Sequence, residues 1–199
     1  MTKKISVEDI KKLKELSGVG LTDAKNALQE ADGDFDKALS AMRKKGLTKA
    51  EKRGDRETRE GLVEAYVHDG RIAAIVEVNC ETSFVAKTDE FKDLAHKLAI
   101  QVASMNPKWV SEKDIPEELF EQAKKEQEAS LTGKEPADKK EQILSAKVKK
   151  HFAEVVLMSQ PYVFNDKQTV ADFIKESIAK LGENITVGQF KRIELGVVE

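Results

Sequence analysis

The sequence predicts an α+β protein: an N-terminal three-helix module, a linker, and a small antiparallel three-stranded sheet packed with helices and a protruding helical hairpin. Apolar residues recur at helical spacing between glycines over residues 1–45. From Gly61 onward, two β-rich runs flank an Asp-Gly pair, which is a strong short-range signal of a β-hairpin. Between residues 116 and 158, two highly charged helical patterns with narrow apolar stripes indicate an antiparallel helical hairpin.

Three short helices account for the pattern of the N-terminal module. Ser6 and Asp9 have the spacing of a capping box at the start of the first helix. We expect Thr22 to cap the second helix and Asp34 to cap the third, which Gly46 ends. The apolar residues expected in the core of this module are Leu13, Leu16, Ala24 and Leu28.

Residues 46–60 are nearly all charged or small, so they have little apolar surface to bury. We interpret them as a linker that can be helical in part. Their excess of Lys and Arg would suit a phosphate contact, but the composition favours a solvated tether.

Two strands are predicted over residues 62–67 and 72–79, on either side of the turn at Asp69 and Gly70. Residues 187–197 are expected to add a third strand, because an isolated two-stranded hairpin is only marginally stable. The second strand is apolar on both faces, which predicts a central or covered strand; the residues concerned are Ile72, Ala74, Val76 and Val78 on one face and Ala73 and Ile75 on the other.

The remaining elements follow from apolar stripes and from proline and glycine. A helix is predicted from about Thr88 to Met105, and the two helices of the hairpin follow, the second ending near Met158. Residues 160–166 are interpreted as a loop with exposed apolar side chains, and residues 170–181 as a short helix.

Composition limits the classes of function. The 199 residues include 34 basic and 36 acidic side chains, and the net charge of −2 argues against capture of nucleic acid by the whole protein. A single cysteine, Cys80, fits a reducing compartment, and with no long apolar run we expect a cytoplasmic protein without membrane contact. His68, His96 and His151 lack the spacing of metal ligands, so no metal or cofactor is expected. No pair of carboxylates stands out as a catalytic pair.

Several segments carry a family resemblance. Residues 16–28 and 31–35 are similar to the ubiquitin-associated-like N-terminal module of elongation factor Ts, and residues 77–87 are similar to the central signature of that family. Residues 133–150 and 159–163 match further family segments in the expected order. The chain resembles the short bacterial form, and the domains implied are a helical module over 1–45, a charged linker over 46–60, and a core over 61–199 whose hairpin covers about 116–158.

The resemblance implies a guanine nucleotide exchange factor that acts by binding elongation factor Tu, without covalent catalysis. Such a factor binds the GDP-loaded GTPase, disturbs its magnesium and phosphate site, and leaves when GTP rebinds. By analogy with short family members, a homodimer built through the core is also implied. The alternative is a non-catalytic adaptor with a ubiquitin-associated-like module and a coiled-coil arm, which would not need the loop at residues 82–85.

The resemblance places the exchange loop at Thr82, Ser83, Phe84 and Val85. It implies that Phe84 wedges between helices of the partner's nucleotide domain. The alternative from the residues alone is that Phe84 fixes the loop to this protein's own core, as buried aromatic residues usually do. The chain departs from the family at Ser83, where Asp is usual, so a charge-based role at this position is in doubt and the steric role of Phe84 gains weight.

Two further surfaces are implied to meet the partner. The first is the turn at Gly20, Leu21 and Thr22, with Lys25 at its edge. The second surface combines Gln101 with the loop at residues 162–164. Gln101 matches a helix position that faces the partner in the family, and an ordinary solvated glutamine is an equal alternative. The loop at Tyr162, Val163 and Phe164 matches a segment that meets a distal domain of the partner, and the alternative is a loop tucked onto the sheet.

Overall fold

The computed structural model describes residues 5–17, 20–130 and 140–197. Its architecture is α+β, as the sequence predicts. The chain divides into two compact units. One comprises Met1–Glu64, Glu77–Lys97 and Asp172–Gly188, and the other comprises Ala65–Val76, Leu98–Ala171 and Gln189–Glu199. The domain boundaries at residues 45 and 60 stay predictions.

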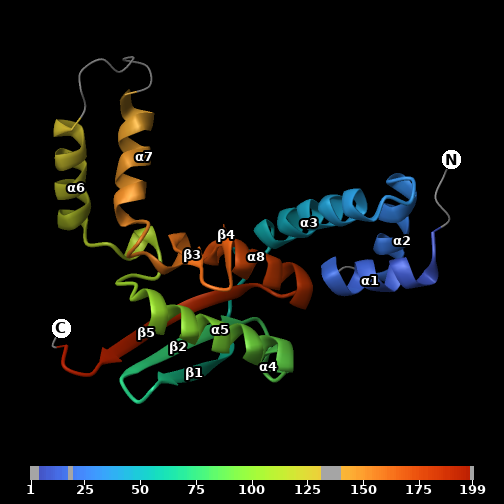
Figure 1. The fold of residues 1–199 in the computed structure, drawn as a ribbon, viewed down its shortest axis with the longest axis horizontal. Helices are drawn as coiled ribbons and strands as arrows, with labels where there is room; N and C mark the ends of the chain where they lie inside the picture. Colours follow the sequence, from blue (N-terminus) through green and yellow to red (C-terminus); the bar gives the residue numbers. More distant parts are fainter. Residues whose placement is uncertain (1–4, 18–19, 131–139, 198–199) are drawn as a thin grey trace. The chain divides into compact units, whose positions relative to one another are not determined.

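The three predicted N-terminal helices are present (Figure 1) as α1 (Val7–Ser17), α2 (Leu21–Glu30) and α3 (Phe35–Glu51). The capping box is confirmed, since the Asp9 amide donates to the Ser6 hydroxyl at 2.9 Å. Asp34 caps α3 by accepting from the amide of Lys37 at 3.0 Å, and this bond lowers the pKa of the Asp34 carboxyl. The helices enclose a small core of Leu13, Ala24, Ala27, Leu28, Ala38 and Met42.

Three details of this module differ from the prediction. Helix α2 begins at Leu21 with Gly20 as its N-cap, so Thr22 lies inside the first turn and does not cap it. Leu16 is exposed rather than part of the core. Helix α3 does not end at Gly46 but continues to Glu51. This glycine instead allows α3 to approach α8 (Val170–Leu181), since a Cβ at Gly46 would lie 3.1 Å from that of Ala179.

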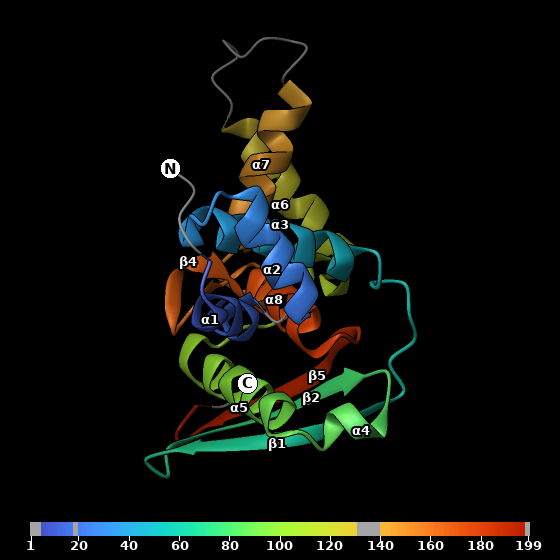
Figure 2. The same ribbon diagram turned by 90° about the vertical axis from the view of Figure 1, so that its right-hand side faces the viewer.

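The antiparallel sheet consists of β1 (Glu60–His68), β2 (Ile72–Cys80) and β5 (Ile185–Glu194), in the order β1-β2-β5 (Figure 2). The Asp-Gly turn joins the first two strands as predicted. Asp69 and Gly70 both have positive φ, 49° and 66°, which is typical of a type I′ turn. The strand order confirms the central position predicted for the second strand.

The two faces of the sheet differ in burial. On β2, one face is buried through Ala74, Val76, Val78 and Cys80. Helix α5 (Asp89–Met105) contacts the strands: His96 Nδ1 lies 2.9 Å from Glu64 Oε1, and Arg192 Nε donates to the carbonyl of Ala103 at 3.0 Å. The opposite face is not covered within the described chain and exposes Val67, Ile75, Ile193 and Leu195.

The helical hairpin consists of α6 (Glu117–Ala129) and α7 (Lys140–Phe152), which run side by side after the short turn η1 (Glu112–Asp114) (Figure 1). Its joint at residues 131–136 lies outside the described residues. The predicted second helix is too long, because the chain leaves α7 after Phe152 and the Lys108 amide donates to the carbonyl of Val155 at 2.8 Å. The shared apolar cluster is Ile115, Ala123, Leu144, Val148, Phe152 and Val156.

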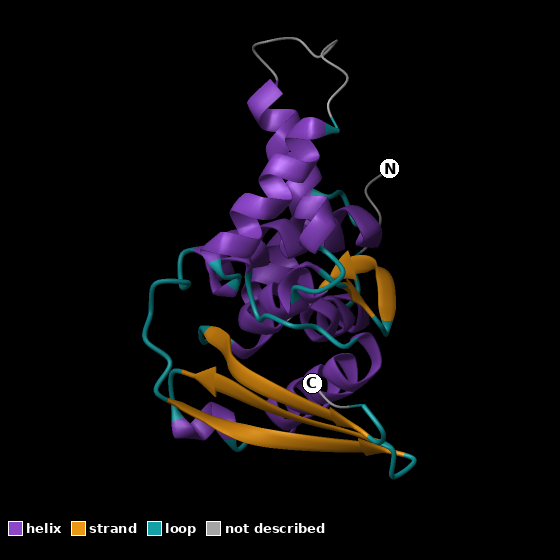
Figure 3. Cartoon of the chain, turned by 90° about the vertical axis from the view of Figure 1, so that its left-hand side faces the viewer, coloured by secondary structure: helices purple, strands orange, loops and turns teal. Residues whose placement is uncertain are grey.

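The segment predicted as a loop at residues 160–166 forms a small β-hairpin instead. After the turn η2 (Leu157–Ser159), β3 (Pro161–Tyr162) pairs antiparallel with β4 (Asn165–Thr169), seen as the smaller pair of orange strands in Figure 3. The sequence gives no alternating apolar pattern here, so the usual strand signal is missing. Helix α8 and β5 then complete the fold near the predicted positions.

Candidate functional site

A single helical turn, α4 (Ser83–Ala86), is separated from the end of β2 by two residues and, with its N-cap Thr82, forms the predicted exchange loop (Figure 2). Phe84 is 84% exposed, although it is a large aromatic side chain. Ser83 and Val85 are partly buried, and Ala86 is buried beneath the turn. The alternative in which Phe84 packs on the protein's own core is therefore wrong, and the ring is free to meet another molecule.

Thr82 begins this turn and is held from two sides. Its hydroxyl accepts from the Val85 amide at 3.5 Å, which caps α4. Its amide donates to Glu183 Oε2 at 2.9 Å, and its hydroxyl donates to Glu183 Oε1 at 2.6 Å. Cys80 Sγ also donates to the Thr82 carbonyl at 3.2 Å. The turn that presents Phe84 is thus fixed at both its backbone and its side chain.

The neighbouring residues extend this support. The Asn184 amide donates to Glu81 Oε1 at 2.6 Å, and Arg56 Nη1 lies 3.2 Å from Glu81 Oε2. Asn184 is buried, and its side chain donates to the carbonyls of Arg56 at 2.8 Å and Gly54 at 3.3 Å. Sequence reasoning missed Glu81, Glu183 and Asn184, because nothing in a single sequence connects positions about 100 residues apart.

The predicted N-terminal surface is exposed at the start of α2. Gly20, Leu21, Thr22 and Lys25 are all exposed, and Leu21 and Lys25 lie one helical turn apart on the same face. An exposed apolar side chain therefore lies beside a cation at the start of α2. Residues 18 and 19, which precede it, lie outside the described residues.

Gln101 is completely buried, which corrects the alternative of a solvated glutamine and leaves its side chain no direct access to a partner. Its Nε2 donates to the carbonyl of Pro161 at 3.1 Å and to Gln160 Oε1 at 3.2 Å. Its Oε1 accepts from the Val163 amide at 2.9 Å. Gln101 therefore holds the β3–β4 turn in place.

At that turn, the predicted residues separate by burial. Tyr162 is buried, as the tucked-loop alternative expected, whereas Val163 and Phe164 are exposed. The rings of Tyr162 and Phe164 lie 5.4 Å apart between centroids, so the buried ring supports the exposed one. The surface available to a partner consists of Val163 and Phe164.

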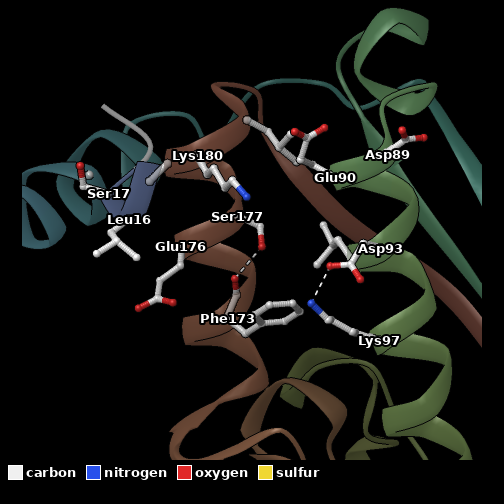
Figure 4. A pocket seen from close by; sticks show the side chains of 14 residues that line it. Leu16, Ser17, Asp89, Glu90, Asp93, Lys97, Phe173, Glu176, Ser177 and Lys180 are labelled. Atoms are coloured by element: carbon white, nitrogen blue, oxygen red, sulfur yellow. Dashed lines mark hydrogen bonds and ion pairs between the residues drawn. The ribbon is translucent and has the colours of Figure 1, made fainter. Parts of the chain in front are cut away.

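An open pocket of about 440 Å³ lies between α5 and α8 (Figure 4). Within it, Lys97 pairs with Asp93, and the Ser177 hydroxyl donates to the carbonyl of Phe173 at 2.9 Å, as the dashed lines in Figure 4 mark. Over the described ranges, no group of three or more His, Cys, Asp or Glu side chains is placed to hold a metal ion.

Comparison with known proteins decides the family. The sequence model described as Elongation factor TS matches residues 6–197, nearly the whole chain. The chain belongs to the elongation factor Ts family. Elongation factor Ts of Thermotoga petrophila is 49% identical over 193 residues, which are 96% of each chain. The relatives from Petrotoga mobilis and Carboxydothermus hydrogenoformans are each 45% identical over 194 residues, covering 96% of this chain and 98% and 89% of theirs.

A member of this family is a translation elongation factor, and the family resemblance seen in the sequence is confirmed. Among the helices that the structure describes, none has the length and apolar character to cross a membrane. The matched region includes the turn with Phe84, the start of α2 and the β3–β4 hairpin.

The hydrogen bond and ion pair of Glu81 are expected to make the stability of the protein depend on pH. The Asn184 amide and then Arg56 lower the pKa of the Glu81 carboxyl, so its contribution is present above the ordinary value of about 4.3 and is lost as the pH falls through the lower folded value. We expect E81Q to melt below the wild type near neutral pH, and the gap to close below about pH 4. Melting followed by circular dichroism across this range tests it; a gap independent of pH would contradict the role of the charge.

Proposed function

We propose that this protein is the guanine nucleotide exchange factor of elongation factor Tu. It binds the GDP-loaded GTPase, promotes GDP release, and is displaced when GTP rebinds. The observation that carries the proposal is Phe84, an exposed aromatic ring on a turn held by hydrogen bonds. The factor acts in the cytoplasm by binding alone, with no covalent step, cofactor, membrane or nucleic acid contact.

Exchange by binding requires that the factor and the nucleotide weaken each other's affinity by the same factor. A thousandfold weakening corresponds to about 4 kcal/mol. Burial of one phenylalanine supplies roughly 1.5–3 kcal/mol, so Phe84 needs help from other contacts. Leu21 and Lys25 on α2 and Phe164 on the β3–β4 turn provide exposed side chains for this purpose.

Ser83 favours one of two ways of disturbing the nucleotide site. A carboxylate at this position would repel phosphate or compete for the magnesium ion, but serine carries no charge. The mechanism that we propose is therefore steric: the Phe84 ring enters between helices of the partner and shifts the segments that hold magnesium and phosphate.

The test is release of a fluorescent GDP analogue from elongation factor Tu of the same organism. Adding the factor with excess unlabelled GDP should accelerate the loss of fluorescence in proportion to its concentration until saturation. Binding without faster release would instead support the adaptor alternative, and neither binding nor release would contradict both functions.

We also propose a homodimer built through the exposed sheet face. Val67, Ile75, Ile193 and Leu195 leave apolar surface there that a second copy would cover. We expect sedimentation to give about twice 22.2 kDa for the wild type, and I193D to sediment as the monomer. The control is V7D, which places the same charge at an exposed apolar site on α1. A wild-type protein of monomer mass at working concentration would contradict the dimer.

A further inference from the structure

Glu183 uses both of its carboxylate oxygens on a single residue. One oxygen accepts from the amide of Thr82 at 2.9 Å and the other from its hydroxyl at 2.6 Å. The donated hydroxyl can still accept, and it takes the Val85 amide at 3.5 Å. The chain of donors therefore runs from the amide of α4 through Thr82 to Glu183, and it fixes both the backbone and the side chain at the start of the turn.

The turn needs such support, because α4 has only four residues. A helix of this length is not stable by itself. Phe84 points into solvent and contributes little packing, so within α4 only Ala86 is buried. The orientation of the Phe84 ring thus depends on how firmly Thr82 is held.

Glu183 lies in the short connection between α8 and β5, and its neighbours hold the backbone there. It follows Gly182, which ends α8 in the left-handed conformation at φ 81°. The next residue, Asn184, is buried and donates through its side chain to the carbonyls of Arg56 and Gly54. The connection between α8 and β5 is therefore fixed on both sides of the carboxylate.

We propose that Glu183 is the positioning residue of nucleotide exchange: its carboxylate holds Thr82 so that Phe84 meets the GTPase in one orientation. This rests on the proposed exchange function. Without the hydrogen bonds from Thr82 to Glu183, the turn samples several orientations, and only the fraction of molecules in the competent orientation is productive. The α2 surface and the β3–β4 turn remain, so the loss falls mainly on the maximal rate of GDP release and less on the concentration that gives half of it.

The experiment measures release of fluorescent GDP from elongation factor Tu at increasing concentrations of E183Q. A glutamine presents one acceptor and turns its NH₂ group toward the other donor, so we expect the maximal rate to fall by about 5- to 10-fold. T82V removes the hydroxyl and keeps the amide, so it should reduce the maximal rate in the same way. T82S keeps a hydroxyl, so its maximal rate should be higher than that of T82V. The control is E112Q, which breaks the ion pair of Glu112 with Lys149 in the helical hairpin.

A double variant distinguishes positioning from general damage to the fold. If Glu183 acts through the ring, E183Q should have no further effect on the release rate in the F84A background, because the group that it positions is gone. Wild-type release by E183Q, or multiplied losses in the double variant, would overturn the inference while leaving the exchange function intact. A wild-type chain that does not accelerate release would instead overturn the proposed function itself, and this inference with it.

Discussion

Replacement of Phe84 by alanine is expected to reduce GDP release from elongation factor Tu by about 10- to 100-fold, which corresponds to loss of one buried phenylalanine at the interface. The fold should be retained, because 84% of this side chain is exposed in the free protein and few internal contacts are lost. The measurement pairs the fluorescent-nucleotide assay with a thermal melt of the same preparation.

L119A is the matched control for this variant. Leu119 is also an exposed apolar residue, but it lies on α6 in the helical hairpin, outside the three predicted partner surfaces. We expect L119A to exchange nucleotide like the wild type, and F84L to retain more activity than F84A. If F84A melts like the wild type and releases GDP at the wild-type rate, the wedge assignment is wrong.

Replacement of Gly61 by alanine is expected to be the most damaging single change to stability. A Cβ at this position of β1 would lie 2.2 Å from the carbonyl oxygen of Val78 and 2.8 Å from the Cα of Asn79. Both atoms belong to the backbone of β2, which is the central strand and cannot move aside without breaking its pairing. We expect a loss of about 3 kcal/mol or more in the free energy of unfolding, measured by urea titration.

G188A tests this explanation on another strand of the same sheet. A Cβ at Gly188 would also be close to a neighbour, at 2.7 Å, but that neighbour is the carboxylate of Glu77 at the end of a flexible side chain. This carboxylate can rotate away, so we expect a loss of about 1 kcal/mol or less. Equal stability of G61A and the wild type would show that β1 and β2 separate more easily than their backbone contact suggests.

The parts of the fold that the sequence predicts well depend on local signals. Ser6 and Asp34 each cap the helix that follows them by accepting from an amide three residues on, and the Asp-Gly pair determines the turn between β1 and β2 within four residues. The family motif points to Phe84, whereas the exposure of its ring follows only from the structure. The end of α3 was predicted wrongly, because Gly46 serves a contact with α8 that its own helix does not reveal.

The parts that the sequence could not predict depend on residues far apart in the chain. Gln101 has the same local pattern whether it is solvated or buried, and only its partners at Pro161 and Val163 decide the matter. The bonds between Glu183 and Thr82 join residues 101 positions apart. Polar side chains such as these have no periodicity that distinguishes a hydrogen-bonded residue from a solvated one.

Cys80 gives the protein a chemical reporter of its own. Burial raises the pKa of this thiol, and its sulfur donates to the carbonyl of Thr82, at the base of the turn that carries Phe84. An alkylating reagent reaches the sulfur only when this region opens. Because the chain has no second cysteine, the rate of alkylation reads out how often the turn opens, with no label to introduce.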